Sequence, residues 1–285
     1  MFAVISILLG TTFAFPLARA FPDLSLLPPL VILVAMLVAG WVMTKFVNGK
    51  PFGAIGLSFH PAMFRELGIG VLIGFAMILG VFLAEVISGC LSVSWRGLTP
   101  VSVVRVLILS FITFGIGVVA EEVAFRGYLF QTMIQAVTFL PATVLMAILF
   151  ALVHRLNPGI TWLGLVNVGI AGVWLSIAYM KTRSLWLPIG LHWAWNFSQT
   201  TMFGLPTSGI DGASFRLLDV VQRGPEWVTG GVFGPEGGVL VTLSLIIGTG
   251  VVLKVRSLRA PEGIITLDSI EDLLGPQNGS GEAPK

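Results

Sequence analysis

Long apolar runs, each close to the length of a bilayer-crossing helix, recur along this sequence of 285 residues. A helix needs about 20 apolar residues to cross the hydrocarbon of a membrane. The runs lie near 2–18, 25–45, 66–90, 102–124, 139–155, 160–180, 185–203 and 236–254. Only helices and closed barrels satisfy every backbone hydrogen bond in lipid, and these runs do not alternate with a period of two. The sequence therefore predicts an all-α, multi-pass transmembrane helical bundle of about eight spans, with no sheet.

Composition supports this class and excludes others. The chain is 55% hydrophobic and 11% charged, which is more apolar than a soluble domain of this size accommodates. The net charge of +2 and the lack of a Lys/Arg cluster exclude a nucleic-acid partner. The single cysteine, Cys90, allows neither an internal disulfide nor a CxxC zinc site.

The two ends of the chain set the limits of the bundle. The first run, MFAVISILLGTTFAFPLARA, ends like a cleaved signal peptide, but it lacks a positive amino-terminal region, so we expect a retained helix. The last residues are polar and rich in Gly and Pro, which is typical of disorder. We expect four segments: N-terminal transmembrane helices at 1–98, a motif-bearing core at 99–203, a loop with the last transmembrane helix at 204–260 and a disordered polar tail at 261–285.

Two adjacent acids and a base end one apolar run, at Glu121, Glu122 and Arg126. Ionisable side chains within a membrane segment are costly, and they usually face a protein-lined cavity, so they are functional candidates. Glu122 and Arg126 are four residues apart and share a helix face, whereas Glu121 points about 100 degrees away. We expect the arginine to hold Glu122 and to leave Glu121 free. The alternative is that all three form a purely structural charge network.

Two further pairs have the same spacing of four residues. Phe150 and His154 form the first pair, close to a helix-ending Asn-Pro-Gly sequence, and His192 and Asn196 form the second. Each pair has a plainer interpretation. His154 could be an interfacial residue, and His192 with Asn196 could join helices by hydrogen bonds.

Helix geometry brings these groups together. Residues 121 and 154 are symmetric about position 137.5, and the sequence offers a break between two apolar runs there, at Thr138–Pro141. At about 1.5 Å per residue, antiparallel neighbours would then place Glu121 and His154 at a similar depth. By the same count, His192 lies about 12 to 15 Å above the turn at 181–183. The sequence predicts that the groups converge near the middle of the membrane.

The chemistry of this set suits amide hydrolysis. A carboxylate beside a histidine in a wet cavity of low dielectric is well placed to take a proton from water. The Asn196 amide and a second histidine can donate hydrogen bonds to the oxyanion of a tetrahedral intermediate. The motifs HExxH, GxGD and GxSxG, which mark other hydrolase designs, do not occur.

A zinc site is the alternative for the same residues. Glu121, His154 and His192 would supply the two-histidine, one-carboxylate set of a catalytic zinc ion. Asn196 is a poor zinc ligand and is better explained as an oxyanion donor. We therefore favour a site with no cofactor and keep zinc as the alternative.

The three pairs also resemble a known family. The run AEEVAFRGYLF resembles the EExxxR motif of the CPBP family (CAAX proteases and bacteriocin-processing enzymes, also called ABI), and FALVH and LHWAWN resemble its FxxxH and HxxxN motifs. The order of the motifs agrees, over roughly residues 100–200, and TGGVFGPEGG is similar to bacterial members.

The resemblance implies an intramembrane endopeptidase related to the type II CAAX prenyl endopeptidase. It implies Glu121 as the base for water, His154 as its assistant, and His192 with Asn196 as the oxyanion site. Glu122 and Arg126 carry over as supporting residues and Phe150 as a packing residue, and the family carries a metalloprotease label. Expected partners are the bilayer, in a bacterial inner membrane, and a membrane-associated or lipidated peptide. The alternative is a non-catalytic scaffold or a bacteriocin self-immunity protein.

Two other features need an interpretation. Glu85 lies near the end of its apolar run, and we expect it to reach the membrane interface. The segment Pro206–Pro235 is a long loop with several glycines, which either covers the site as a lid or is passive.

Overall fold

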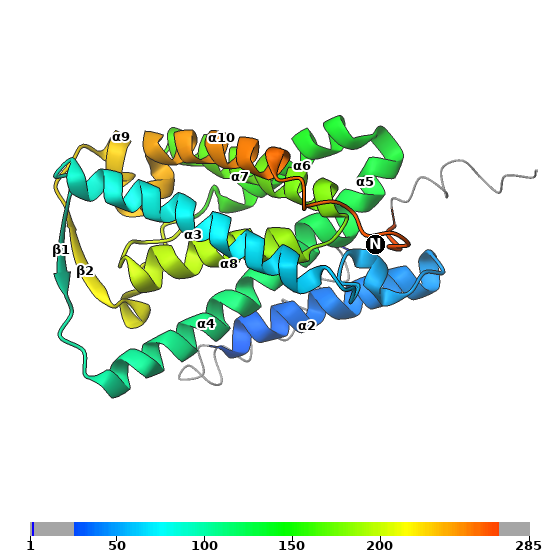
Figure 1. The fold of residues 1–285 in the computed structure, drawn as a ribbon, viewed down its shortest axis with the longest axis horizontal. Helices are drawn as coiled ribbons and strands as arrows, with labels where there is room; N and C mark the ends of the chain where they lie inside the picture. The colour runs from blue at the N-terminus through cyan, green and yellow to red at the C-terminus, as the bar shows by residue number, and fades with distance from the viewer. Residues whose placement is uncertain (1, 3–25, 268–285) are drawn as a thin grey trace, which may run out of the picture.

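The computed structural model describes residue 2 and residues 26–267, which form a bundle of helices (Figure 1). In the described residues the main helices are α2 (Leu27–Val42), α3 (Met63–Ile87), α4 (Pro100–Glu122), α5 (Phe130–Val137), α6 (Phe139–His154), α7 (Trp162–Thr182), α8 (Trp186–Phe197), α9 (Glu226–Thr229) and α10 (Val239–Lys254). Two π-helical segments, η3 (Val123–Leu129) and η4 (Ser198–Met202), continue α4 and α8. The predicted all-α membrane class is confirmed.

The number of membrane spans agrees only in part with the prediction. Four helices in the described part of the chain are long and apolar enough to cross a bilayer, at 29–47, 63–87, 100–137 and 162–182. The helices Phe139–His154 and Val239–Lys254 are apolar but shorter. The first predicted span, apart from Phe2, lies outside the described residues. The count of eight spans therefore stays a prediction.

Local signals explain where the helices of the core begin and turn. The Thr99 side chain accepts a hydrogen bond from the Ser102 N–H, and Pro100 occupies the first position of α4. From there α4, η3 and α5 run on as one apolar helix of 38 residues. It ends at Thr138, whose φ of 70° lies in the left-handed region. The predicted break between the first and second motif-bearing helices is thus confirmed at Thr138.

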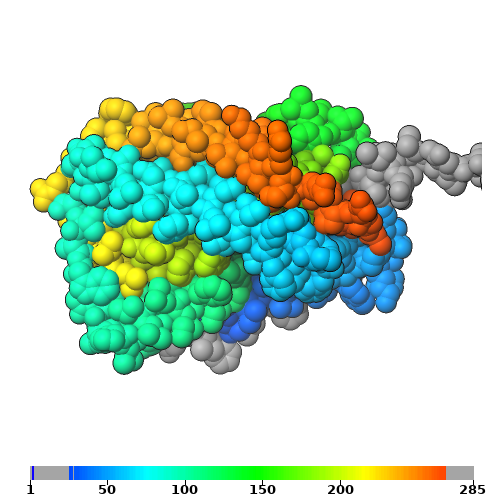
Figure 2. Space-filling view, in the orientation of Figure 1, coloured from blue at the N-terminus to red at the C-terminus, as the bar shows by residue number. Residues whose placement is uncertain are grey.

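Helix α8 is the central helix of the bundle. It packs against α3, α4 and α7, and eight of its twelve residues are buried. A helix that is apolar on all sides is expected in such an interior position. In the space-filling view, α3 and α4 lie on either side of the small part of α8 that is visible (Figure 2).

Glycines allow α3 and α8 to approach closely. A Cβ atom at Gly74 of α3 would lie 2.3 Å from the Leu191 carbonyl oxygen, and one at Gly190 of α8 would lie 2.4 Å from the Leu67 carbonyl oxygen. Gly70 and Gly74 form a small-xxx-small pair, which is typical of close helix contacts in membranes. This contact sets the position of α8, and with it the position of His192 and Asn196.

The expectation that the chain has no sheet is wrong at one end of the bundle. β1 (Leu91–Trp95) pairs antiparallel with β2 (Leu218–Gln222), so that Val93 faces Val220 (Figure 1). β1 follows α3 directly, and β2 lies in the long loop before α10. Both strands lie in polar segments outside the apolar runs. Water can satisfy the unpaired backbone groups at the strand edges there, so the requirement that lipid imposes on backbone hydrogen bonds does not apply to them.

Two smaller expectations also need correction. Glu85 does not reach an interface, because its side chain is fully buried. The expectation of a disordered tail from residue 261 is wrong at Leu267, which is buried and whose N–H donates to Gln131 Oε1 at 2.7 Å. Residues 268–285 lie outside the described residues.

Replacing Gly74 by alanine is expected to separate α3 from α8. The added methyl group meets backbone, which cannot rotate away, so we expect a loss of about 1–3 kcal/mol in the free energy of unfolding. Thermal unfolding in detergent micelles measures it. Gly80→Ala is the matched control on the same helix, since nothing lies within 4 Å of a Cβ there. Equal unfolding temperatures for the two variants would contradict this account of the contact.

Candidate functional site

The two neighbouring glutamates lie in different environments at the end of α4. The Glu122 side chain is fully buried, whereas the Glu121 side chain is 40% exposed. Glu121 lines a cavity of about 570 Å³ between α4, α6, α7, α8 and the loop before α10. The predicted difference between the two acids is therefore confirmed. The π-helical segment η3 begins directly after them, and such segments are frequent at functional sites.

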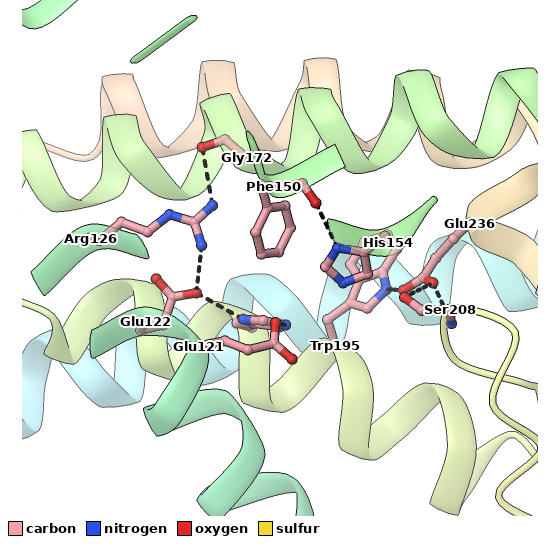
Figure 3. A network of polar contacts seen from close by, with 10 residues as sticks. Glu121, Glu122, Arg126, Phe150, His154, Gly172, Trp195, Ser208 and Glu236 are labelled. Atoms are coloured by element: carbon pink, nitrogen blue, oxygen red, sulfur yellow. Dashed lines mark hydrogen bonds and ion pairs between the residues drawn. The ribbon is translucent and has the colours of Figure 1, made fainter. Parts of the chain in front are cut away.

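Glu122 is held by two partners. Arg126 Nη1 donates to Glu122 Oε1 at 3.1 Å, and His192 Nδ1 contacts the same oxygen at 2.8 Å (Figure 3). Arg126 is also buried, and its Nη2 donates to the Gly172 carbonyl of α7 at 3.3 Å. The predicted pairing of Glu122 with Arg126 is confirmed. The network joins α4, α7 and α8, which the sequence alone did not indicate.

Phe150 packs at the centre of the network. Its ring lies 4.5 Å from the Arg126 guanidinium carbon, an arrangement in which the ring face attracts the cation. The same ring lies 4.6 Å from the His154 ring and 6.4 Å from the His192 ring, between centroids. The expectation of a packing residue is thus met, and the ring separates the buried arginine from the cavity-lining histidine.

His154 lies at the end of α6 and lines the cavity. Its Nδ1 is 2.7 Å from the Phe150 carbonyl oxygen, so Nδ1 carries the proton and donates to it. In the neutral ring Nε2 then has a free lone pair. The structure brings Glu121 and His154 to one cavity, but it shows no direct bond between them in the described residues. The nearest imidazole nitrogen to Glu121 is His192 Nε2, 3.9 Å from Oε2.

Asn196 completes the predicted set. It lies one helical turn after His192 on α8 and lines the same cavity. Within the described residues, its side-chain amide makes no hydrogen bond to the protein. An amide N–H is therefore free to donate to a molecule in the cavity.

A further carboxylate, Glu236, lines the cavity and was missed as a site residue. Its Oε2 accepts from the N–H and Oγ of Ser208 at 2.6 and 2.7 Å, and its Oε1 accepts from Trp195 Nε1 at 3.2 Å (Figure 3). Burial raises the pKa of the Glu236 carboxyl, while the two hydrogen bonds from Ser208 oppose this rise. The sequence signal was GPEGG, which is similar to bacterial members of the CPBP family. It lies in a loop, so no helical spacing relates it to the EExxxR, FxxxH and HxxxN motifs.

The predicted zinc set is not assembled as a ligand cluster. Among residues 2 and 26–267, no three His, Cys, Asp or Glu side chains are placed to hold a metal ion. His192 Nδ1 and His154 Nδ1 already have protein partners, so each ring has one nitrogen left for the cavity. The metalloprotease label therefore has no support in this geometry.

Fold and site together define a multi-pass helical membrane protein with a buried glutamate–arginine–histidine network beside a cavity that a second glutamate lines. Residues 102–198 match the family described as type II CAAX prenyl endopeptidase Rce1-like, which confirms the resemblance inferred from the motifs. All three motifs lie within that segment.

The comparison with curated proteins gives one weaker likeness. The uncharacterized protein YyaK of Bacillus subtilis (strain 168) is 25% identical over 194 residues, which cover 66% of this chain and 64% of that protein. The chain thus aligns with slightly less than two thirds of this relative. No solved structure matches. The family match supports a CAAX-type intramembrane protease kind of function.

Replacing Arg126 by methionine is expected to destabilise the protein strongly. The change leaves the Glu122 charge buried without its arginine, which costs about 3–5 kcal/mol in the free energy of unfolding. Chemical unfolding in detergent measures the loss. The double variant Glu122→Gln, Arg126→Met should lose less than the single variant, because no charge is left unpaired. Arg105→Met, at an exposed position of α4, is the control and should stay within about 0.5 kcal/mol.

Proposed function

We propose that this protein is an intramembrane endopeptidase that hydrolyses a peptide bond of a membrane-associated or lipidated peptide. The observation that carries the proposal is the unequal state of the two glutamates. Glu122 is locked by Arg126 and His192, and Glu121 faces the cavity with its carboxylate available. Because Arg126 pairs with the Glu122 carboxylate, it does not neutralise the Glu121 carboxylate.

In the proposed reaction, Glu121 acts as the general base. It takes a proton from a water molecule in the cavity while the water oxygen bonds to the carbonyl carbon of the peptide. His154 presents the lone pair of Nε2 to the same water and helps to orient it. The proton on Glu121 then passes to the leaving amine nitrogen as the C–N bond breaks. Atoms and charges balance without any cofactor.

The carbonyl oxygen gains negative charge in this step and needs donors. Asn196 offers its free amide, and His192 offers Nε2 when both of its nitrogens carry protons. The His192 ring lies 2.8 Å from Glu122 and 3.9 Å from Glu121, and two nearby negative charges favour the protonated ring. Removal of one oxyanion donor in known hydrolases costs about 3–4 kcal/mol in the barrier.

The same proposal covers location and partners. The apolar helices associate with the lipid bilayer. We infer a bacterial cell membrane as the site of action, because the curated relative comes from Bacillus subtilis. We propose that the substrate approaches from the membrane, because the cavity lies between the apolar helices α4, α6, α7 and α8.

Replacing Glu121 by glutamine tests the role of the base. The change keeps the shape and removes the proton acceptor, so we expect cleavage of quenched-fluorescence, lipid-anchored peptides in liposomes to fall by about 10²–10⁴-fold. The unfolding temperature should not change. Glu226→Gln, at an exposed glutamate of α9, is the matched control and should cleave normally. Equal cleavage with and without Glu121 would refute the proposed role.

Peptides with and without a prenyl group belong in the same panel. If the folded wild-type protein cleaves none of them, while it still protects cells against a bacteriocin, the non-catalytic immunity function is the better interpretation.

The absence of a metal requirement is a separate prediction. We expect less than stoichiometric zinc in the purified protein and unchanged cleavage after treatment with a chelator, because the cavity residues do not form a ligand cluster. Metal analysis by mass spectrometry measures the content. Stoichiometric zinc that is lost in both His154→Ala and His192→Ala, but kept in His60→Gln, would establish a metal site instead.

A further inference from the structure

A short segment of the long loop covers one side of the cavity. We call residues 206–212 the roof loop. Thr207, Ser208, Ile210, Asp211 and Gly212 line the cavity together with Glu121 and His154. This segment lies outside the family match at 102–198, so the match assigns no role to it. The sequence left two roles open for the long loop, a lid over the site or a passive connection. The contacts that hold the roof loop distinguish these roles.

Ser208 is the best-anchored residue of the roof loop. Its N–H and Oγ both donate to Glu236 Oε2, and its carbonyl oxygen accepts from Asn157 Nδ2 at 2.9 Å. Its φ of 49° lies in the left-handed region, which is unfavourable for a residue with a side chain. Such a conformation persists only where the surroundings impose it, and it is frequent at functional sites.

Glu236 connects the roof loop to two helices of the site. Its Oε1 accepts from Trp195, which lies on α8 between His192 and Asn196 in the sequence. Its backbone carbonyl accepts from Asn167 Nδ2 of α7 at 2.8 Å. A single residue thus joins the cover of the cavity to the helix that carries the proposed oxyanion donors.

The carboxyl group of Glu236 is a costly choice for a purely structural anchor. Within residues 2 and 26–267, no lysine or arginine forms an ion pair with it, and three neutral donors replace its hydration instead. Burying a carboxylate without a cation is costly, and a neutral side chain could hold a loop at lower cost. Glu236 lines the same cavity as His154 and His192, which gives a reason to keep a carboxyl group at this position.

We propose that Glu236 is a positioning residue of the hydrolytic site, which holds the roof loop over the cavity and orients the face of α8 that carries His192 and Asn196. The inference rests on the proposed function and adds to it a residue from outside the family-matched segment. A peptide in the cavity would lie between the roof loop and Glu121.

Hydrogen exchange tests the anchor without any substrate. In Glu236→Gln, the amide group turns one donor toward Ser208 or Trp195, and one bond is lost. We expect backbone exchange of residues 206–212 to rise by at least tenfold in liposomes, with an unchanged unfolding temperature. Glu226→Gln, in the same loop but outside this cavity, should exchange as the wild type does. Unchanged exchange in Glu236→Gln would overturn the proposal.

Kinetics test the link to catalysis. We expect Glu236→Gln to lower kcat/KM by about 10–100-fold, Ser208→Ala to lower it by a few fold, and the double variant to lose no more than Glu236→Gln alone. A merely structural role would instead lower the unfolding temperature. The effects of Glu236→Gln and Ser208→Ala on kcat/KM would then be independent and would add in the double variant. Normal cleavage by Glu236→Gln beside inactive Glu121→Gln overturns this inference alone, whereas no cleavage by the wild type overturns the proposed function and this inference together.

Discussion

The buried pair of Glu122 and Arg126 is the interaction on which the rest of the site depends. Charges in the apolar interior of a bundle are tolerated only when they are paired and hydrogen-bonded. Arg126 meets this requirement through Glu122 and the Gly172 carbonyl, and His192 is a second partner of the Glu122 carboxylate. The network fixes α4, α7 and α8 around the cavity. Because Arg126 pairs with Glu122, Glu121 is left facing the cavity, where its nearest imidazole nitrogen is His192 Nε2 at 3.9 Å.

Close helix packing gives the network its precision. Gly74 and Gly190 let the backbones of α3 and α8 touch, and α8 is therefore held on several sides by neighbouring helices. A helix held in this way cannot shift without breaking many contacts. His192 and Asn196 thus face the cavity from a rigid support, while Glu121 and His154 come from α4 and α6. The cavity is assembled from helices that are distant in sequence.

Much of the site could be predicted from local spacing, and the failures share one cause. The pairing of Glu122 with Arg126 follows from their separation of four residues, and the break at Thr138 follows from the gap between two apolar runs. The spacing placed Glu121 and His154 at a similar depth, but it did not indicate that His192 Nε2 would lie 3.9 Å from the Glu121 carboxylate, because that contact depends on the packing of α4 against α8. Glu236 was missed since it is joined to Trp195 and Ser208 only through the fold.

The sequence by itself determined the class of this protein: apolar runs of bilayer length require helices, and the spacing of charged residues within one run decides which acid is paired. The length of an apolar run and the face on which a residue lies are properties of a single helix. They can be read from the sequence, because a helix has a fixed rise and a fixed period. Only the tertiary structure decided that His192 contacts both glutamates, that the loop before α10 covers the cavity, and that β1 pairs with β2. These features join segments that are far apart along the chain, and they arise from the packing of complete side chains, which no local pattern records.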